Sequence, residues 1–546
     1  MEPDGVKQTT ASSGVSVNAS SRDVTIEFPS GTDPAAHTIR ISAAPSIAGS
    51  LFGALDYLTS FPYGCTEQTM SGFLPDVLVS QALGKLGVPL KESQAQLHAQ
   101  VTAGLQKLSD THHSDGGWGW WQEDDSQVFM TAYVVSGLQQ AVNAGYSEAE
   151  PGIDAGAKYL SRQLEQHPRM LPDLRAFVVY ALALHKQDVA KQLDTLYGRR
   201  SDLSAQALAY TGLAMRLAKD SRSGEVANLL ERKANVQGEL ASWTADRNNL
   251  LDIDTNESAA ATAFALKFLL QEHPGSPLLP KAAQWLMLRR DEGSWWGSTQ
   301  DTAFVLYGLI DYVAATQELN ADMDVDVSIN GASVTHRHFD RNDALHGAQV
   351  EVDADAAHLR PGANTVHLIT RGSGRAYWSI RGDYYSNAKS AYQQGSMNLN
   401  IARDYFKLVP TQENGHVVYA LQPLTGPVEQ GDVLAVHLGV TGSPQKYLLI
   451  EDPIASGTEF VRNRDSYNIK GRPDTWTDWY TRQEFHDDRA AFFSTTFSQR
   501  QDLFYLVQVT NAGSFEISPA RVTPMYQPGV QATTDALHLD VREVAR

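Results

Sequence analysis

The sequence predicts a multidomain protein of mixed α and β structure, with a block of helical hairpins between two β-rich parts. Three observations predict this class. A chain of 546 residues is longer than one hydrophobic core usually serves. Apolar and polar residues alternate from about residue 12 to 45 and again from about residue 322, as strands require. The residues from about 49 to 318 have helical spacing and contain an internal repeat.

The first strands are predicted from three alternating stretches before residue 45, which read VSVNAS, DVTIEF and HTIRIS. Similar alternation follows the helical block in DVDVSI, AQVEVDA and NTVHLITR, and it continues to the end of the chain in DVLAVHLGV, LFYLVQV and LHLDVRE. Alternation with period two places one set of side chains on a buried face and the other on an exposed face. Both flanks of the helical block are therefore predicted to be β-rich.

The helical block repeats a pattern in which an alanine and an aromatic or aliphatic residue open an apolar helix. The shared alanines are spaced 33 to 54 residues apart, which suits one helical hairpin per repeat. With the segment after Cys65, about six hairpins are expected. Six hairpins can close into an α/α toroid, which needs no capping repeats, and an open solenoid is the alternative. The repeated alanines are Ala132, Ala176, Ala209, Ala263 and Ala303.

Two glycine–tryptophan stretches precede repeat helices, at residues 115–126 and 291–301. Glycine permits tight turns, and tryptophan can cover the end of a helical core. The favoured interpretation is that these tryptophans close the ends between hairpins. The alternative is a platform for a carbohydrate or terpenoid substrate. That enzyme would need a pair of carboxylates, for which Glu123, Asp124 and Asp125 are the local candidates.

The composition excludes several classes of function. A formal net charge of −19 argues against nucleic-acid binding, and no apolar run is long enough to span a bilayer. The single cysteine rules out internal disulfide bonds. The segment DIDTNE at residues 252–257 begins like a calcium loop but has Glu257 where that loop needs glycine, so no metal site is expected. No phosphate-binding or dinucleotide motif predicts a cofactor.

The single cysteine lies in PYGCTEQT, residues 62–69. Three interpretations are open: a buried structural thiol, a catalytic thiol, and a thiol that reacts with its own neighbour. Cys65 and Gln68 are three residues apart, so one helical turn brings the sulfur to the carboxamide. Attack with loss of ammonia would make a thioester, and the N-terminus of the following helix would favour charge developing on the carbonyl. An apolar shield against water could come from Phe61, Pro62, Tyr63 and Phe73.

The stretch FPYGCTEQ resembles the Cys-x-Glu-Gln thioester signature of the α2-macroglobulin and complement thioester proteins, especially the bacterial α2-macroglobulins. The stretches DGGWGWW, NESAAATAFAL and WWGSTQDTAFVLYGL are similar to that family's thioester domain, and YLLIEDPIASGTEF and NAGSFEISPARVTPMYQPGV to its C-terminal sandwich. The resemblance implies an α/α-toroid thioester domain inserted in a CUB-like β domain, followed by a macroglobulin-like β-sandwich. The implied boundaries are 1–48 and 319–395 for the CUB-like domain, 49–318 for the toroid and 396–546 for the sandwich.

The resemblance also implies a mechanism. Cys65 and Gln68 would form the thioester, supported by Glu67 and Gly64, and a lysine amine of a target protease or a small amine such as methylamine would attack Gln68. The chain would then be the C-terminal part of a broad-spectrum protease inhibitor that reacts once per molecule, so it is not expected to be an enzyme. Some relatives use a histidine to redirect acylation, but neither His167 nor His185 aligns with it convincingly.

The inferred role places the protein in the periplasm or outside the cell. A further N-terminal part could associate it with a membrane. Two alternatives stay open on the sequence: an α/α-toroid enzyme acting on a terpenoid or polysaccharide, with Cys65 incidental, and an adhesin that uses the same thioester to attach to host or cell-wall amines.

Overall fold

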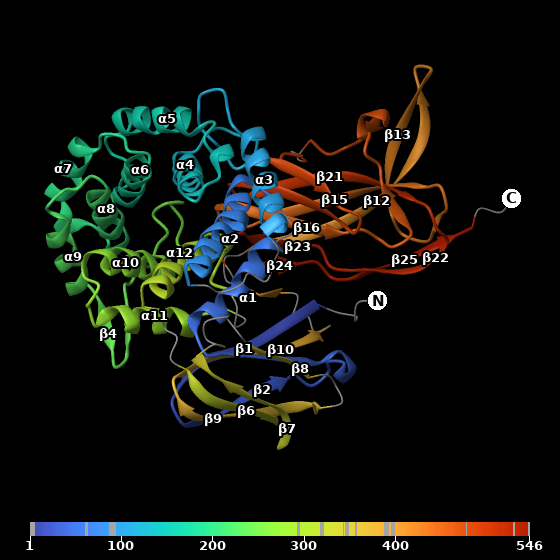
Figure 1. The fold of residues 1–546 in the computed structure, drawn as a ribbon. Helices are drawn as coiled ribbons and strands as arrows, with labels where there is room; N and C mark the ends of the chain where they lie inside the picture. The colour runs from blue at the N-terminus through green and yellow to red at the C-terminus, as the bar shows by residue number, and fades with distance from the viewer. Residues whose placement is uncertain are drawn as a thin grey trace. The chain divides into compact units, whose positions relative to one another are not determined.

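The computed structural model forms two compact units, residues 9–384 and residues 1–8 with 385–546. Figure 1 shows helices and strands along the chain. Within the described residues, no helix is long and apolar enough to cross a membrane. The structure describes residues 6–60, 64–86, 94–291, 295–316, 321–341, 343, 349–354, 358–386, 393–394, 399–474, 476, 478–527 and 530–543.

The first unit contains a β domain built from strands at both ends of the unit's sequence. Two four-stranded sheets have the orders β1-β10-β3-β8 and β2-β9-β6-β7. The strands that precede the helices are β1 (Val6–Val17), β2 (Ser20–Phe28) and β3 (Thr38–Ala44). Those that follow are β6 (Asp322–Ile329), β7 (Ala332–Phe339), β8 (Val350–Ala354), β9 (Gly362–Ser373) and β10 (Arg375–Ser386).

Pairing between these two groups of strands closes the β domain. Ile41 of β3 lies opposite Ile380 of β10, and Val24 of β2 lies opposite Val366 of β9, both in antiparallel register. Ile41, Ile380 and Val366 are fully buried in one apolar cluster. Because alternate side chains point to the same face, the alternation seen in the sequence provides this core. The helices between β3 and β6 therefore interrupt a β domain.

Twelve helices form the interrupting block within the described residues. They are α1 (Ile47–Thr59), α2 (Thr66–Leu86), α3 (Gln94–Asp110), α4 (Val128–Asn143), α5 (Ile153–Gln166), α6 (Pro172–Leu184), α7 (Ala190–Gly198), α8 (Ala205–Leu217), α9 (Ser223–Arg232), α10 (Ser258–Glu272), α11 (Leu278–Leu288) and α12 (Thr299–Thr316). Each even-numbered helix packs on the next even-numbered helix, and α12 packs on α2. The inner helices thus close a ring, with odd-numbered helices outside (Figure 1). The predicted α/α toroid is confirmed, and the open solenoid is wrong.

The repeated pattern explains how the ring packs. The five repeated alanines lie on α4, α6, α8, α10 and α12, and each is fully buried. A side chain as small as alanine lets neighbouring helices approach closely. The aromatic residue after each alanine points into the centre, where the rings contact one another with centroid separations from 4.6 Å for Tyr210 and Phe264 to 6.1 Å for Phe177 and Phe304. The set is Tyr133, Phe177, Tyr210, Phe264 and Phe304.

Three tryptophans make the same contacts at three hairpin ends. Trp118 donates from its backbone to the Thr131 hydroxyl and from its indole to the Leu108 carbonyl, at 2.9 and 2.7 Å. Trp243 and Trp296 repeat both bonds in their own hairpins. All three are at most 1% exposed. These indoles close the ends of the helical core and satisfy carbonyls at the ends of preceding helices, as the sequence predicted for two of them.

The second unit is a β-sandwich of two six-stranded sheets with a smaller three-stranded sheet. Inward-facing side chains of both large sheets form one apolar cluster. One large sheet has the order β17-β21-β15-β12-β13-β18, with β12 (Asn400–Glu413), β13 (His416–Pro423), β15 (Val433–Thr441), β17 (Thr458–Phe460), β18 (Ile469–Lys470) and β21 (Arg500–Val509).

The other large sheet has the order β11-β24-β23-β16-β20-β19. Its strands are β11 (Gln393–Gln394), β16 (Gln445–Pro453), β19 (Arg482–Phe485), β20 (Arg489–Phe497), β23 (Arg521–Pro524) and β24 (Gln531–Thr533). The three-stranded sheet joins β14 (Val428–Glu429), β25 (Leu537–Arg542) and β22 (Gly513–Ile517). The predicted sandwich after the toroid is confirmed, and the exact domain boundaries stay predictions.

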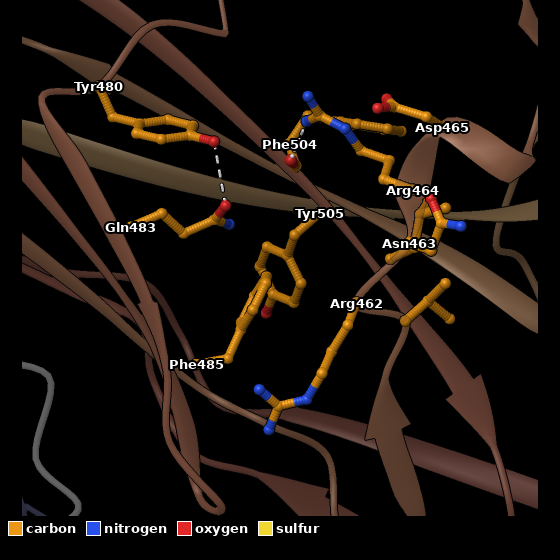
Figure 2. A pocket seen from close by; sticks show the side chains of 11 residues that line it. Arg462, Asn463, Arg464, Asp465, Tyr480, Gln483, Phe485, Phe504 and Tyr505 are labelled. Atoms are coloured by element: carbon orange, nitrogen blue, oxygen red, sulfur yellow. Dashed lines mark hydrogen bonds between the residues drawn. The ribbon is translucent and has the colours of Figure 1, made fainter. Parts of the chain in front are cut away.

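The sandwich has a small surface pocket of about 190 Å³ beside β21. Figure 2 shows Arg462 and Arg464 at its edge and the rings of Phe485 and Tyr505 on its wall. The Arg464 guanidinium donates to the Asp478 carboxylate at 2.7 Å, and Tyr480 donates to Gln483 at 3.0 Å. These polar groups already have partners within the protein, so the pocket offers no buried unpaired charge.

Candidate functional site

The Cys65 motif lies at the point where helix α2 begins. The Thr69 N–H donates to the Cys65 carbonyl at 2.9 Å, which is the first hydrogen bond of the helix. The Thr66 N–H donates to the Trp120 carbonyl at 2.9 Å, so the glycine–tryptophan loop before α4 fixes the helix start. Cys65 is 1% exposed and Gln68 is 5% exposed. The motif is therefore fixed at the start of α2 and is shielded from water.

The Gln68 side chain turns back toward Cys65. Its Oε1 accepts a hydrogen bond from the Cys65 backbone N–H at 3.1 Å, and the Gln68 backbone N–H lies 3.5 Å from the Cys65 Sγ. The carboxamide oxygen and the sulfur thus each contact the backbone of the same helical turn. The donor on Oε1 polarises the carbonyl and would stabilise negative charge on that oxygen, as an oxyanion-hole donor does. The positive end of the α2 backbone acts in the same direction.

The surroundings of the sulfur disfavour a thiolate. Burial is the largest influence and raises the pKa of the Cys65 thiol well above its usual value, and the nearby Glu67 carboxylate raises it further. Hydrogen bonds from the backbone of Gln68 and Glu67 and the charge of Lys107 act in the opposite direction. A neutral sulfur is therefore favoured, which suits a thiol or a thioester better than a free thiolate.

The Glu67 carboxylate contacts side chains of α2 and α12. It is fully buried and accepts hydrogen bonds from the hydroxyls of Ser71 and Thr299, the latter at 2.8 Å. Ser71 in turn lies 2.9 Å from the Tyr133 hydroxyl, and Tyr133 lies 3.4 Å from that of Tyr307. These contacts tie the first turn of α2 to α12 and α4. Glu67 thus positions the motif rather than reacting with Gln68.

Gly64 and Phe73 set how closely α3 approaches the motif. A Cβ built on Gly104 of α3 would lie 2.7 Å from the Phe73 ring, so glycine lets the two helices meet there. One turn later, the Lys107 ammonium occupies the space that a side chain at Gly64 would need. The Phe73 ring thus lies at the contact between α2 and α3, and its role as a shield of the thioester stays a prediction.

Three of the residues predicted to shield the thioester, Phe61, Pro62 and Tyr63, lie outside the described residues. Sequence reasoning missed two neighbours that the fold supplies, Trp120 and Lys107. Both come from segments more than forty residues away, and the packing of α3 and of the loop before α4 against the start of α2 brings them to the motif. The glycine–tryptophan stretch at residues 115–126 was the sequence feature that could have indicated Trp120.

The tryptophans of the 115–126 loop are buried and present no substrate platform. Trp120 and Trp121 are at most 6% exposed, and their backbone N–H groups donate to the Asp124 carboxylate at 3.0 and 3.2 Å. Asp124 therefore holds the loop in shape. Among the described residues, no group of three or more histidine, cysteine, aspartate or glutamate side chains is arranged to hold a metal ion. In the segment 252–257, the carboxylates of Asp252 and Asp254 pair with Arg247.

Two family models match the chain. The A-macroglobulin TED domain matches residues 41–169, which include the Cys65 motif and the first glycine–tryptophan loop. The bacterial alpha-2-macroglobulin MG10 domain matches residues 399–529, which lie in the β-sandwich. The first match lies almost entirely in the predicted toroid, 49–318, and the second lies in the predicted sandwich, 396–546.

Two bacterial proteins of similar sequence are alpha-2-macroglobulins. The chain is 26% identical over 399 residues to an alpha-2-macroglobulin of Thermotoga maritima, covering 70% of this chain and 21% of that protein. It is 25% identical over 506 residues to that of Escherichia coli, covering 87% of this chain and 28% of that protein. The chain thus spans less than a third of the length of these relatives.

Solved structures agree with the fold. A crystal structure of native E. coli alpha-2-macroglobulin, from domain MG7 to the C-terminus, superposes with a TM-score of 0.72 and 20% identity, covering 99% of this chain and 83% of that one. The crystal structure of Salmonella alpha-2-macroglobulin reacted with methylamine gives a TM-score of 0.70 and 20% identity, covering 98% of this chain and 34% of that one. At this identity the match establishes the fold alone.

Proposed function

Because the chain belongs to the bacterial alpha-2-macroglobulin family, whose TED and MG10 domains it carries, we propose that Cys65 and Gln68 form an internal thioester. The observation that supports the proposal is the hydrogen bond from the Cys65 N–H to the Gln68 Oε1, which turns the carboxamide back toward Cys65, whose sulfur contacts the Gln68 backbone N–H. The free thiol and carboxamide of the structure are the groups from which that bond is made.

Formation of the bond needs no cofactor. The Cys65 sulfur attacks the Gln68 carboxamide carbon, a C–S bond forms, the C–N bond breaks, and the thiol proton leaves with the nitrogen as ammonia. The Cys65 N–H donates to the oxygen on which negative charge develops. Burial of the motif keeps water away from the product, which would otherwise hydrolyse slowly.

The thioester makes Gln68 an acyl donor to amines. A neutral primary amine attacks the Gln68 carbonyl carbon, an amide bond forms, the C–S bond breaks, and the proton lost by the amine returns to the Cys65 sulfur through solvent. A thiol leaves more readily than an amide nitrogen because its anion is more stable. The raised pKa of the buried Cys65 thiol slows this departure until the site is exposed. The bond is used once, so the protein is a stoichiometric reagent and not an enzyme.

In the whole protein this chemistry would serve a protease trap. Lysine amines on the surface of a bound protease would be the attacking groups, and methylamine would be the small-molecule substitute. A relative whose structure is described as reacted with methylamine supports the second part. We assign such a trap to the periplasm or the extracellular space, where foreign proteases are met. A toroid enzyme is not favoured, because the tryptophans of the 115–126 loop, which carries its candidate carboxylates, are buried.

A fluorescent primary amine tests the assignment. After mild unfolding, dansylcadaverine should couple to Gln68 and release one thiol at Cys65, whereas Cys65→Ala should do neither. Gln68→Asn, whose shorter side chain keeps the amide, is the matched control and should also fail to couple. Coupling in Cys65→Ala would contradict the mechanism. In the full-length protein, coupling that requires prior protease cleavage distinguishes a trap from an adhesin, which would label without it.

A further inference from the structure

A second cavity, of about 520 Å³, lies in the first unit away from the Cys65 motif. Its walls come from β3 and β10 of the β domain, from α1, and from the segment that follows α11. This volume is within the range of cavities that bind small organic molecules. Nothing in the proposed thioester chemistry uses it.

A buried cation lines this cavity. Arg290 is 8% exposed, and its guanidinium donates to the carbonyls of Met287 and Trp378 at 3.0 and 3.3 Å. No carboxylate of the described residues forms an ion pair with it. Burial lowers the pKa of Arg290 to about 10, which reports the cost of holding that charge away from water. A buried charge without a counter-ion is destabilising, and a bound anion would remove that cost.

The other two arginines of the cavity are already neutralised. Arg40 forms a two-point pair with Asp353, at 2.7 and 3.0 Å, and Arg381 donates to Asp383 at 2.8 Å. Two serines on adjacent strands, Ser42 and Ser379, hydrogen-bond to each other at 2.7 Å. The guanidinium of Arg290 is therefore the group that selects the charge of a ligand.

The opposite wall of the cavity is aromatic. The rings of Tyr57 from α1 and Trp295 are stacked, with centroids 4.7 Å apart and an angle of 9° between their planes. Both are partly exposed, so an aromatic face is available to a ligand. Stacked rings present a flat apolar surface that favours a flat or apolar group.

We propose that this cavity binds a small organic carboxylate, with the carboxylate on Arg290 and the organic part against the pair formed by Tyr57 and Trp295. Arginine and carboxylate match in a planar, two-point geometry. Two further residues of the cavity, Asp56 and Glu351, carry negative charge and are exposed. They disfavour a multiply charged anion such as phosphate, so the single charge of a carboxylate fits best.

The probe for this site is 4-fluorophenylacetate, observed by ¹⁹F NMR in the presence of the intact chain. We expect its ¹⁹F signal to broaden on binding. Acetate and inorganic phosphate should compete with the probe for the site only weakly. Arg290→Gln should weaken binding about tenfold or more, since a hydrogen-bonded charge is lost. The adjacent and exposed Arg289 is the matched control, and Arg289→Gln should bind like the wild type. The amine 4-fluorophenethylamine should not bind.

A second variant changes binding in the other direction. Glu351→Gln removes a repelling charge and should tighten binding about two- to threefold. Glu351 is exposed, so we expect this substitution to keep the fold. It therefore tests carboxylate binding at the cavity even if Arg290→Gln is unstable. Cys65→Ala should bind the probe unchanged, which separates this site from the thioester. Unchanged binding in both Arg290→Gln and Glu351→Gln, or displacement by phosphate at a lower concentration than by acetate, would overturn the proposal.

Discussion

The hydroxyl of Thr299 gives the most informative single substitution in the toroid. Thr299 lies at the first turn of α12 and donates to the buried Glu67 carboxylate at 2.8 Å. Thr299→Val keeps the size and branching of the side chain but removes this donor. The Glu67 oxygen then loses one partner in a site from which water is excluded. The contact between α12 and the first turn of α2 should weaken as a result.

The expected magnitude follows from the burial of the pair. Thr299 is 5% exposed and Glu67 is fully buried, so the cost is that of leaving a buried, charged acceptor short of a donor, about 1–3 kcal/mol. In a unit of this size, about 1 kcal/mol lowers the Tm by roughly 2 °C, so a decrease of roughly 2–6 °C is expected. The loosened helix start should also speed hydrolysis of the thioester.

Thermal unfolding monitored by circular dichroism measures this effect. The matched control is Thr195→Val in α7, an exposed threonine whose hydroxyl only donates to the Lys191 carbonyl of its own helix. Thr195→Val should shift the Tm by less than about 1 °C, because exposed substitutions are usually within 0.5 kcal/mol of neutral. Equal shifts for Thr195→Val and Thr299→Val would refute the inference that Thr299 anchors Glu67.

Three further substitutions test separate parts of the structure. Asp301→Asn should flatten the pH dependence of stability. Burial raises the pKa of Asp301 from 3.8 to about 7, and its buried neighbour Glu257 titrates together with it, so the stability that Asp301 contributes is fully present below about pH 4 and is lost as the pH rises to about 7. Lys107→Met should raise the pKa of the free Cys65 thiol further, because a nearby positive charge is removed, and thiol titration after amine treatment measures it. Trp243→Phe should destabilise the toroid by about 1–3 kcal/mol, since the Leu230 carbonyl loses its indole donor.

Each of these has a clear contrary outcome. Unfolding free energies of Asp301→Asn that fall between about pH 4 and pH 7 as steeply as those of the wild type would show that this carboxyl does not carry the pH dependence. An unchanged thiol pKa in Lys107→Met would mean that the Lys107 charge does not influence Cys65. A neutral Trp243→Phe variant would show that the indole hydrogen bond adds nothing to burial of the ring.

The architecture could be predicted because periodic patterns in the sequence indicate its strands and its repeated helices. The repeated alanine–aromatic pairs, such as Ala132 with Tyr133, predict helices that pack closely around an aromatic centre, and the structure has that centre. The interruption of the β domain followed from alternation on both sides of the helices. The closure of the ring was predicted less firmly. The contact between α12 and α2 joins residues more than two hundred apart, and no local pattern encodes it.

The site was predicted only in part, and for a physical reason. Cys65 and Gln68 are within one helical turn, so their juxtaposition follows from local geometry. The partners that hold them do not follow from it. Thr299, Lys107 and the Trp120 carbonyl reach the motif only through packing between helices, which a single sequence does not specify. Trp243 was missed because its loop lacks the repeated glycines of the other two.

The most direct test of the thioester is the intact mass of freshly purified native chain, measured with and without methylamine. The account predicts a mass lower than that of the sequence by one ammonia, and a gain of one methylamine at Gln68 with one new thiol at Cys65 after treatment. Cys65→Ala should show the full sequence mass and no gain. A wild-type chain at the full mass of the unmodified sequence, with a free Cys65 thiol and no methylamine adduct, would contradict the account.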